Sequence, residues 1–365
     1  MRFTKGFLLI FSFMLVGYSE AGNDILSKYV NNSTPAFATL IMKDHKVIFK
    51  GVQGCAVLEN GKCISKAAFD TPFAICPITK HFTAASILML EEEGKLSTED
   101  YVSKYIPDLP IQFKDIKIKH LIFHISGIPD YLADPGAMDF NYMIRQGKKL
   151  TESDAFDFIV KSKLQPYSKA HVYSNSGYIL LTKVIENVSG VSYANFIQQR
   201  FFNKFGMKDA FVMSTIAKHK NYAEAYTSWP LYTPSNWMKA LILSGDGGIF
   251  MSMNDFQKWI YAFENNKIFA KPETMKKFLS IGTYDDGRDV MMRGSDKYGF
   301  GLIHSEKNKN GKKYNIIFHS GGMAGSTALF SNIQSESESI WLVYLNNASS
   351  YPDSFAILDQ AKIKY

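Results

Sequence analysis

Hydrophobic and polar residues alternate near both ends of the chain, and this alternation predicts β-strands. Close to the start, residues 36–43 and 46–53 form two such stretches, joined by a turn at Asp44-His45. Near the end, four further stretches of the same kind follow one another: YGFGLIHS, KYNIIFHS, STALFSNI and SIWLVYLNN. We therefore expect strands at both termini.

Between these ends the pattern becomes helical. From Ile78 onward the apolar residues recur with a helical period, and Gly94 is a typical C-terminal cap. Helices and long loops are expected to about residue 280, and the segment Ser354 to Ile363 predicts a closing helix. The simplest arrangement is an α/β fold. One antiparallel sheet is formed from both chain ends and flanked by helices, with a mostly helical region inserted. Two separate sheets would leave a pair of strands to cover themselves.

Residues 1–21 have the features of a secretory signal peptide. Arg2 and Lys5 form a basic start, an apolar run follows from residue 6 to 17, and small residues precede a cleavage site after Ala21. The apolar run is too short to span a bilayer comfortably, so we expect no transmembrane segment after cleavage. The protein is thus expected to be exported, either periplasmic or secreted.

The remainder, residues 22–365, is expected to be one domain. Residues 22–76 and 290–365 supply the sheet region and 77–289 the mainly helical region, and 46% hydrophobic residues allow a large core. The net charge of +7 is spread thinly, without a basic cluster that contains aromatic residues, which argues against nucleic acid. It permits a mild attraction to anionic cell-wall polymers or membranes, although an ordinary solvated surface explains it equally.

The cysteines give an ambiguous signal. Cys55 and Cys63 flank an Asn60-Gly61 turn, and an exported protein permits a disulfide. A two-residue turn, however, places Cys63 opposite Leu58, so the register argues against an easy bond between the two cysteines. Cys76 is left over and is expected to be a small buried residue.

Several short segments, in this order and spacing, carry a family resemblance: TPFAICPITKHFTAASILMLEEEGKL, HLIFHISGIPDY, YSNSGYILL, GDGGIFMSMNDF, YGFGLIHS and FHSGGMAGS. Together they resemble the serine β-lactamase and penicillin-binding protein group, especially its class C, D-aminopeptidase and esterase-like branch. The resemblance covers nearly all of the chain after residue 21. It implies hydrolysis of an amide or ester through an activated serine, without a cofactor or metal.

Three motifs of that group form the active site, and the resemblance implies a role for each matching residue. Ser-x-x-Lys matches at Lys80, and Tyr-x-Asn at Tyr173 and Asn175. Tyr173 would be the base that activates the serine, because a lysine charge favours the phenolate. Lys80 would tune this tyrosine and shuttle protons, and Asn175 would hold Lys80 and the substrate amide.

The third motif, Lys-Thr-Gly or His-x-Gly on a strand, matches at His319 and Gly321. His319 would face the substrate carboxylate or the oxygen of Tyr173. Gly321 and Gly322 would line the substrate, and the backbone N–H of Gly322 would be one oxyanion donor. The expected partner is therefore a small peptide-like or cell-wall ligand.

The chain departs from the family at the nucleophile, where it has Pro77. A proline has no hydroxyl, and it also lacks the backbone N–H that would be the second oxyanion donor. The first turn of a helix accepts proline, so the fold is expected to survive. Neither Cys76 nor Thr79 should point where the serine would, because one position around a helix turns a side chain by roughly 100°.

His120 and His124 are spaced for one helix face, which is compatible with a zinc site. The zinc motif needs Glu after the first histidine, and Leu121 stands there. We expect these histidines to be structural and predict no metal.

Three interpretations follow. The favoured one is a catalytically impaired family member that binds a peptide-like or cell-wall ligand. The first alternative is an active esterase, amidase or D-alanyl-peptide carboxypeptidase, using a substitute nucleophile or a water activated by Tyr173. The second is a structural interaction protein whose pocket is a relic.

Overall fold

A computed structural model of the chain describes residues 25–133, 142, 146–165, 170–227, 232–235, 241, 243–309, 311–323, 325–349 and 352–363. The signal peptide expected at residues 1–21 lies outside these ranges. Within them, no helix is both long and apolar enough to cross a bilayer.

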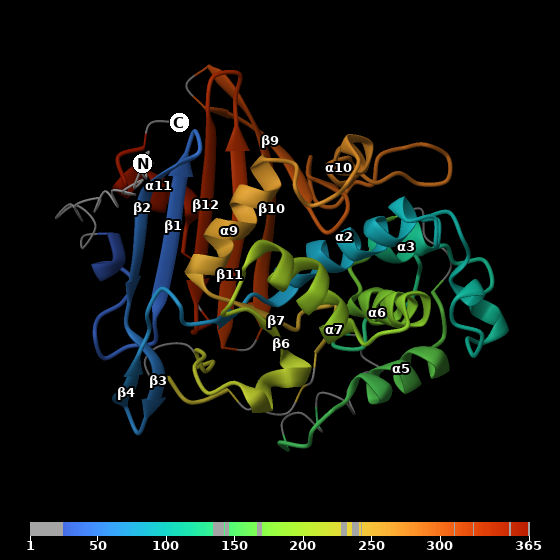
Figure 1. The fold of residues 1–365 in the computed structure, drawn as a ribbon, viewed down its shortest axis with the longest axis horizontal. Helices are drawn as coiled ribbons and strands as arrows, with labels where there is room; N and C mark the ends of the chain where they lie inside the picture. Colours follow the sequence, from blue (N-terminus) through green and yellow to red (C-terminus); the bar gives the residue numbers. More distant parts are fainter. Residues whose placement is uncertain are drawn as a thin grey trace, which may run out of the picture.

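Both ends of the chain contribute to one seven-stranded antiparallel sheet, in the order β2-β1-β12-β11-β10-β9-β8 (Figure 1). Strand β1 pairs with β2 through the predicted turn and with β12, so that Phe37 lies opposite Asn346. This confirms the expected α/β fold class. The strands of the sheet are β1 Phe37–Lys43, β2 Lys46–Gln53, β8 Lys297–Tyr298, β9 Ile303–Lys309, β10 Lys312–Met323, β11 Ser326–Gln334 and β12 Ser339–Asn346.

Both faces of the sheet are covered, which explains why β1 is apolar at nearly every position. Leu40 faces the main core, between the sheet and the helical region, whereas Phe37 and Ile41 face a second core that includes α11 (Ser354–Gln360). Successive side chains of a strand point to opposite faces, so a strand buried on both sides needs apolar residues throughout.

Most helices lie on one side of the molecule in Figure 1, whereas α9 lies across one face of the sheet and α11 packs against the other face. There Phe263 of α9 packs edge-on against Trp341 of β12. Helix α2 begins close to Ile78 and ends before Gly94, as predicted. Apart from α11, the α-helices of the described residues are α2 Thr79–Glu92, α3 Ile118–Ile122, α5 Glu152–Lys161, α6 Asn175–Ser189, α7 Tyr193–Ile197, α9 Met253–Glu264 and α10 Pro272–Phe278.

A buried asparagine after β12 ties the sheet to its surroundings. Asn347 is 1% exposed, and its Oδ1 accepts a hydrogen bond from the N–H of Ala36 at 2.6 Å. Its Nδ2 lies 2.8–3.2 Å from the carbonyl oxygens of Cys55, Ala56 and Glu224. One side chain thus bonds to three separate segments. The N–H of Ala36 also bonds to the carbonyl oxygen of Cys55, and the N–H of Glu224 to that of Ala56, so Asn347 reinforces bonds that already join these segments.

The structure contains a disulfide between Cys55 and Cys63, with a Cα–Cα distance of 5.6 Å, although the register of the hairpin argued against an easy bond. The predicted register is present, since Leu58 lies opposite Cys63 in the hairpin of β3 (Cys55–Glu59) and β4 (Lys62–Lys66). The pairing shifts on either side of Val57, however. Such irregularities change the local twist, and here the cysteines fall within bonding distance.

A small three-stranded sheet, β5-β7-β6, was not predicted (Figure 1). Its strands, Phe73–Ala74, Ile249–Met251 and Phe211–Val212, are too short to show a pattern. The sheet matters for function because β5 leads directly into the segment that carries Pro77.

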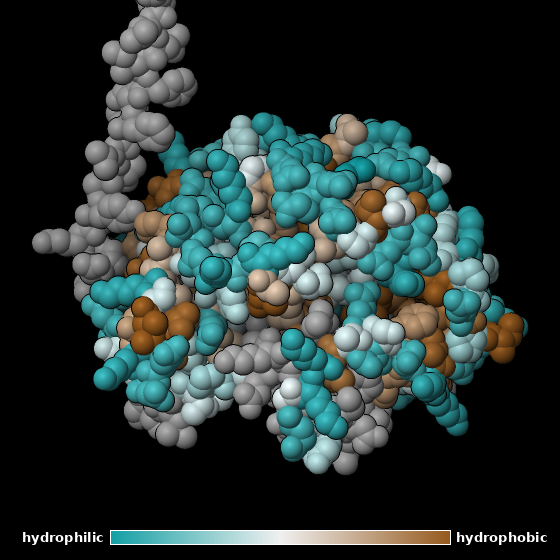
Figure 2. Space-filling view, turned by 60° about the horizontal axis from the view of Figure 1, so that its bottom comes forward, coloured by the Kyte–Doolittle hydropathy of each residue, from teal (hydrophilic) through white to brown (hydrophobic). Residues whose placement is uncertain are grey.

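The surface is mainly polar on the face shown in Figure 2, where hydrophobic side chains form separate small groups. The large exposed hydrophobic residues of the described chain include Ile64, Ile111 and Val172, and of these exposed residues only Val47 and Ile48 are consecutive. That face therefore presents no broad apolar patch of the kind that marks a large protein interface.

Candidate active site

Pro77 stands at the start of the helix that carries Lys80. It occupies the first turn of a 3₁₀ helix, η1 (Cys76–Ile78), which runs directly into α2. The residue before it, Cys76, has a φ of 53°, in the left-handed region that non-glycine residues rarely adopt. A strained residue of this kind persists only where the surrounding structure holds it, and such positions cluster at functional sites.

Strand β10 passes unusually close to this turn. A Cβ added to Gly321 would lie 2.3 Å from the carbonyl oxygen of Ile75 and 3.1 Å from the Cβ of Cys76. Glycine is therefore required at residue 321 for the strand to approach the helix start. Gly322 follows it, opposite Thr327 of β11. The structure thus brings both predicted strand glycines next to the turn that contains Pro77.

Lys80 is completely buried, and polar groups surround its ammonium group. Its Nζ donates to Oδ1 of Asn175 and to the carbonyl oxygen of Asp246, both at 2.7 Å. It also lies 4.8 Å from the ring centre of Tyr173, within the range of a cation–π contact. Lys80, Tyr173 and Asn175 are therefore adjacent. The hydrogen bond from Lys80 goes to Asn175 and not to the tyrosine oxygen.

Two carboxylates complete the surroundings of Lys80. Asn175 donates its Nδ2 to both oxygens of Asp130, at 3.2 and 3.0 Å, and Tyr131 donates its hydroxyl to Asp246 at 2.8 Å. Burial lowers the pKa of Lys80 to about 8, while Asp246 and Asp130 limit the shift. Burial also raises the pKa values of both carboxyl groups. Lys80 therefore remains mostly protonated at neutral pH.

Tyr173 is not prepared to act as a base. Burial raises its pKa well above the usual value, and the nearby Tyr298, Asp130 and Asp246 raise it further. Its hydroxyl oxygen is buried and has no hydrogen-bond partner in the part of the chain that the structure describes. These surroundings favour the neutral phenol over the phenolate that the family resemblance implied.

His319 belongs to a chain of neutral aromatic residues. Its Nδ1 lies 2.7 Å from the carbonyl oxygen of Ser320, so Nδ1 carries the proton and Nε2 accepts. That Nε2 lies 3.3 Å from the hydroxyl of Tyr298, whose oxygen is 3.2 Å from Nε2 of His124. Burial, followed by the charge of Lys80, lowers the pKa of His319 to about 3. His319 therefore contacts the oxygen of Tyr298, and it carries no charge to attract a carboxylate.

Neither neighbouring residue replaces the missing nucleophile. Cys76 is fully buried, and burial raises its thiol pKa to about 12, which leaves almost no reactive thiolate at neutral pH. The hydroxyl oxygen of Thr79 accepts a hydrogen bond from the N–H of Ile249 at 3.1 Å and so helps join α2 to β7. Both side chains serve the packing around the turn.

Asp130, Asp246 and Tyr298 were not among the site residues predicted from the sequence. All three lie in segments that carried the family resemblance, but a single acidic or aromatic residue in a loop gives no chemical signal by itself. The histidine pair His120 and His124 has separate partners, Asp285 and Tyr298. Among the described residues, no group of three or more His, Cys, Asp or Glu is placed to hold a metal ion.

This arrangement of a sheet, a helix-start turn and a buried lysine matches a known class of protein. A sequence model of the Beta-lactamase family matches residues 23–363, and the chain therefore belongs to that family. The penicillin-binding protein homologue of Pyrococcus abyssi, an octamer, has a similar structure. It shares 26% identity with a TM-score of 0.74, over 93% of this chain and 75% of that one.

Two curated relatives are similar to most of this chain. A penicillin-binding protein of Bacillus subtilis (strain 168) is 28% identical over 292 residues, which cover 75% of this chain but only 60% of that protein. Teichoic acid D-alanine hydrolase of Staphylococcus aureus (strain MRSA252) is 27% identical over 314 residues, covering 80% and 72%. The chain thus spans about three fifths of the first relative's length.

Proposed function

We propose that the chain is an exported family member that binds a ligand bearing D-alanine, of cell-wall type, without forming a covalent acyl-enzyme. The ligand class is suggested by the two relatives, one named as penicillin-binding and the other as a teichoic acid D-alanine hydrolase. Export is suggested by the signal-like pattern of residues 1–21. The lack of acylation follows from Pro77.

The observation that carries this proposal is the buried charge of Lys80. A charged group inside a protein costs several kcal/mol of desolvation, and an apolar residue of similar size is often as stable or more stable. Here the charge is kept, with hydrogen bonds to Asn175 and Asp246, beside a tyrosine hydroxyl that has no partner in the described chain. Binding of a polar ligand would account for both the buried charge of Lys80 and the hydroxyl of Tyr173, to which the ligand would bond.

Turnover is disfavoured on three grounds. Pro77 supplies neither the hydroxyl nor the backbone N–H, and loss of one oxyanion donor alone typically lowers a rate about 100- to 1,000-fold. Cys76 and Thr79 are committed to packing. Tyr173 has a raised pKa, so it is a poor base for a water molecule. These points argue against the alternative of an active hydrolase.

A pair of substitutions at residue 77 tests the absence of acylation. Pro77→Ala restores the N–H alone, and Pro77→Ser restores the N–H and the hydroxyl. After incubation with benzylpenicillin or a fluorophosphonate, intact-mass spectrometry should detect an adduct only on Pro77→Ser. A stoichiometric adduct on the parent protein would overturn the proposal. A well-folded Pro77→Ser protein that is never acylated would contradict a retained binding cleft.

Binding is tested separately by calorimetry with peptides that end in D-alanine, using the L-alanine peptides as the stereochemical control. Lys80→Met should weaken the binding by about 2–5 kcal/mol, the usual cost of truncating one partner of a buried charged contact. Lys183→Met, on the exposed side of α6, is the matched control and should have no effect. Equal binding to parent and Lys80→Met would leave the relic interpretation standing.

A further inference from the structure

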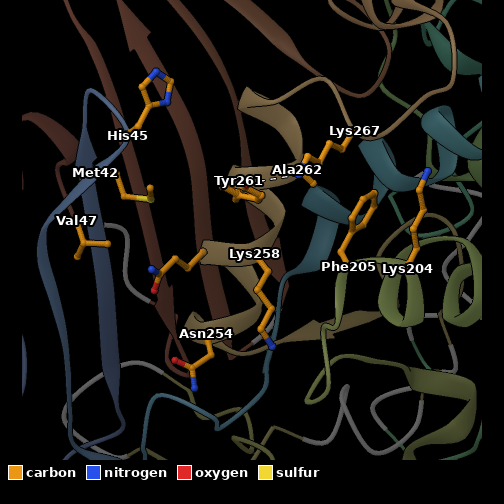
Figure 3. Close-up of a pocket in the computed structure, with 11 residues that line it drawn as sticks. Met42, His45, Val47, Lys204, Phe205, Asn254, Lys258, Tyr261, Ala262 and Lys267 are labelled. Carbon is orange, nitrogen blue, oxygen red and sulfur yellow. Dashed lines mark hydrogen bonds between the residues drawn. The ribbon is translucent and has the colours of Figure 1, made fainter. Parts of the chain in front are cut away.

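A hollow with a volume of about 670 Å³ lies over the outward face of α9, and none of the residues of the candidate active site lines it (Figure 3). The helix forms its floor through residues such as Asn254 and Tyr261. Met42 and Val47, from the hairpin of β1 and β2, form one wall, and Phe205 lies on the other side. We call this hollow the α9 groove.

The α9 groove carries an excess of positive charge. Lys204, Lys258 and Lys267 line it, and Lys50 reaches it from β2 by donating to Oδ1 of Asn254 at 2.6 Å and to Oε1 of Gln257 at 3.0 Å. Of these four lysines, only Lys258 forms an ion pair with a carboxylate of the described residues, Oδ1 of Asp255 at 2.9 Å.

The other three ammonium groups are held by uncharged oxygens. Lys204 donates to the carbonyl oxygen of Ile268 at 3.0 Å and Lys267 to the hydroxyl of Tyr261 at 3.3 Å, while Lys50 bonds only to side-chain amides. Such bonds orient a lysine but do not neutralise it. The groove therefore has several preset donors and lacks matching negative charge.

Electrostatic repulsion within the groove supports this view. Burial lowers the pKa of Lys50, and the nearby charge of Lys258 lowers it further. Burial and Arg200 have the same effect on Lys204. Each shift means that the local environment disfavours the protonated, charged form of the lysine. A bound anion would favour the charged form and so reduce the shift. Of the acidic side chains near the groove, Glu264 is already paired with His45 at 2.9 Å, and Glu92 partly offsets the shift of the pKa of Lys204.

The shape and residue types of the α9 groove limit the kind of anion. The lysines surround a hollow, whereas binding to a membrane surface needs charges that reach a common plane. Arginine, whose planar group favours paired contacts to a single carboxylate or phosphate, does not line it. Its aromatic face at Tyr261 is covered by Lys267, at 4.6 Å from the ring centre, so base stacking of the kind that holds single-stranded nucleic acid is blocked.

We propose that the α9 groove binds a polyol phosphate chain, with successive phosphates at the lysines and the carbon backbone against Met42, Val47 and Phe205. Lysines suit repeated phosphate charges because each acts as a flexible point charge. The apolar wall suits the uncharged links between the phosphates. This site does not depend on the cleft at Pro77, so it stands or falls independently of the function proposed above.

The test is binding of poly(glycerol phosphate) to the mature protein, measured by calorimetry at about 50 to 300 mM NaCl, a range in which screening changes strongly. The double variant Lys204→Gln/Lys267→Gln should weaken binding about tenfold or more, because it removes two charges from the groove. The double variant Lys183→Gln/Lys276→Gln removes the same net charge from exposed positions on α6 and α10 and should change binding less than about twofold.

Lysine acylation of the parent protein, with and without the polymer, gives a second measurement that needs no variant. Lys204 and Lys267 should be protected by the polymer and Lys183 should not. Equal weakening by both double variants, or no protection in the groove, would overturn the proposal, since attraction would then be to net charge. Groove-dependent binding to anionic vesicles or to single-stranded DNA, but not to poly(glycerol phosphate), would overturn it as well.

Discussion

Asn347, after the last strand of the sheet, and Lys80, in the candidate active site, are both almost completely buried, and both bond to segments far away in the sequence. Asn347 is neutral, and its amide meets backbone groups at both of its polar atoms. Lys80 is an ion with a lowered pKa, beside two carboxyl groups with raised pKa values and an unpartnered tyrosine hydroxyl.

The comparison distinguishes buried polar groups that stabilise the native state from buried polar groups that lower its stability. A neutral, fully paired amide stabilises the native state, because its removal leaves backbone groups unsatisfied. A buried ion with shifted titration costs stability and is retained for another purpose. Substitutions at the two places should therefore change stability in opposite directions.

The largest effect is expected at Asn347. Replacing it with alanine leaves the carbonyl oxygen of Glu224 without its hydrogen bond and removes one of two bonds from the Ala36 N–H and from the carbonyl oxygens of Cys55 and Ala56, so the free energy of unfolding should fall by about 2–3 kcal/mol. Urea denaturation at pH 7 measures this loss. Asn187→Ala is the control, because its single bond to the carbonyl oxygen of Tyr105 is exposed, and it should cost about 0.5–1 kcal/mol. Equal losses of stability for Asn347→Ala and Asn187→Ala would contradict a special contribution of the buried amide.

Lys80→Met should act in the opposite direction and stabilise the ligand-free protein by about 2 kcal/mol at pH 7, because the lowered pKa of Lys80 means that burial disfavours its charged form by more than the surrounding groups favour it. Native Lys80 loses its proton near pH 8, whereas an unfolded lysine keeps it to about pH 10.4. Between these values the unfolded chain binds more protons, so the parent gains stability as pH rises and the advantage of the variant shrinks. Thermal melting from pH 6 to 10 measures this, with Lys183→Met as control. A less stable variant at pH 7 would contradict the comparison.

A smaller effect is expected at Glu152, in the first turn of α5. A helix N-terminus normally favours a carboxylate, yet burial, followed by the charge of Glu186, raises the pKa of Glu152 to about 7. The native state therefore holds this proton more tightly than the unfolded chain, and stability falls as pH rises from about 4.5 to 7. Because the side chain is only partly buried, Glu152→Gln should stabilise by about 1 kcal/mol at pH 8.

At pH 5 the same substitution should change the melting temperature little, because the native carboxyl group is already protonated. Glu273→Gln is the matched control, since this residue lies in the first turn of α10 and is exposed. A gain of stability for Glu152→Gln at pH 5 equal to that at pH 8 would show that packing, not ionisation, is responsible.

The sequence predicted the parts of the molecule that depend on repeated local patterns. The apolar run of β1 and the period after Ile78 are such patterns, and the structure confirms the sheet and the helix. The disulfide was missed because the pairing shifts beside Val57, which the turn at Asn60-Gly61 does not reveal. The roles of Asp130 and Asp246 depend on where loops bring them, and burial, not residue type, sets the pKa of Tyr173.

The pairing of β1 with β12 also governs when the protein can finish folding. Ala36 and Asn347 bond across 311 residues, so the central strands meet only after almost the whole chain has been synthesised. Contacts of such long separation fold slowly, because the ordering of the intervening chain is costly before they form. Until then the edge of β1 that faces β12 is an exposed apolar strand, open to pairing with other chains. Because the sheet is completed by its last strand, the edge of β1 remains unpaired during most of the synthesis of the chain.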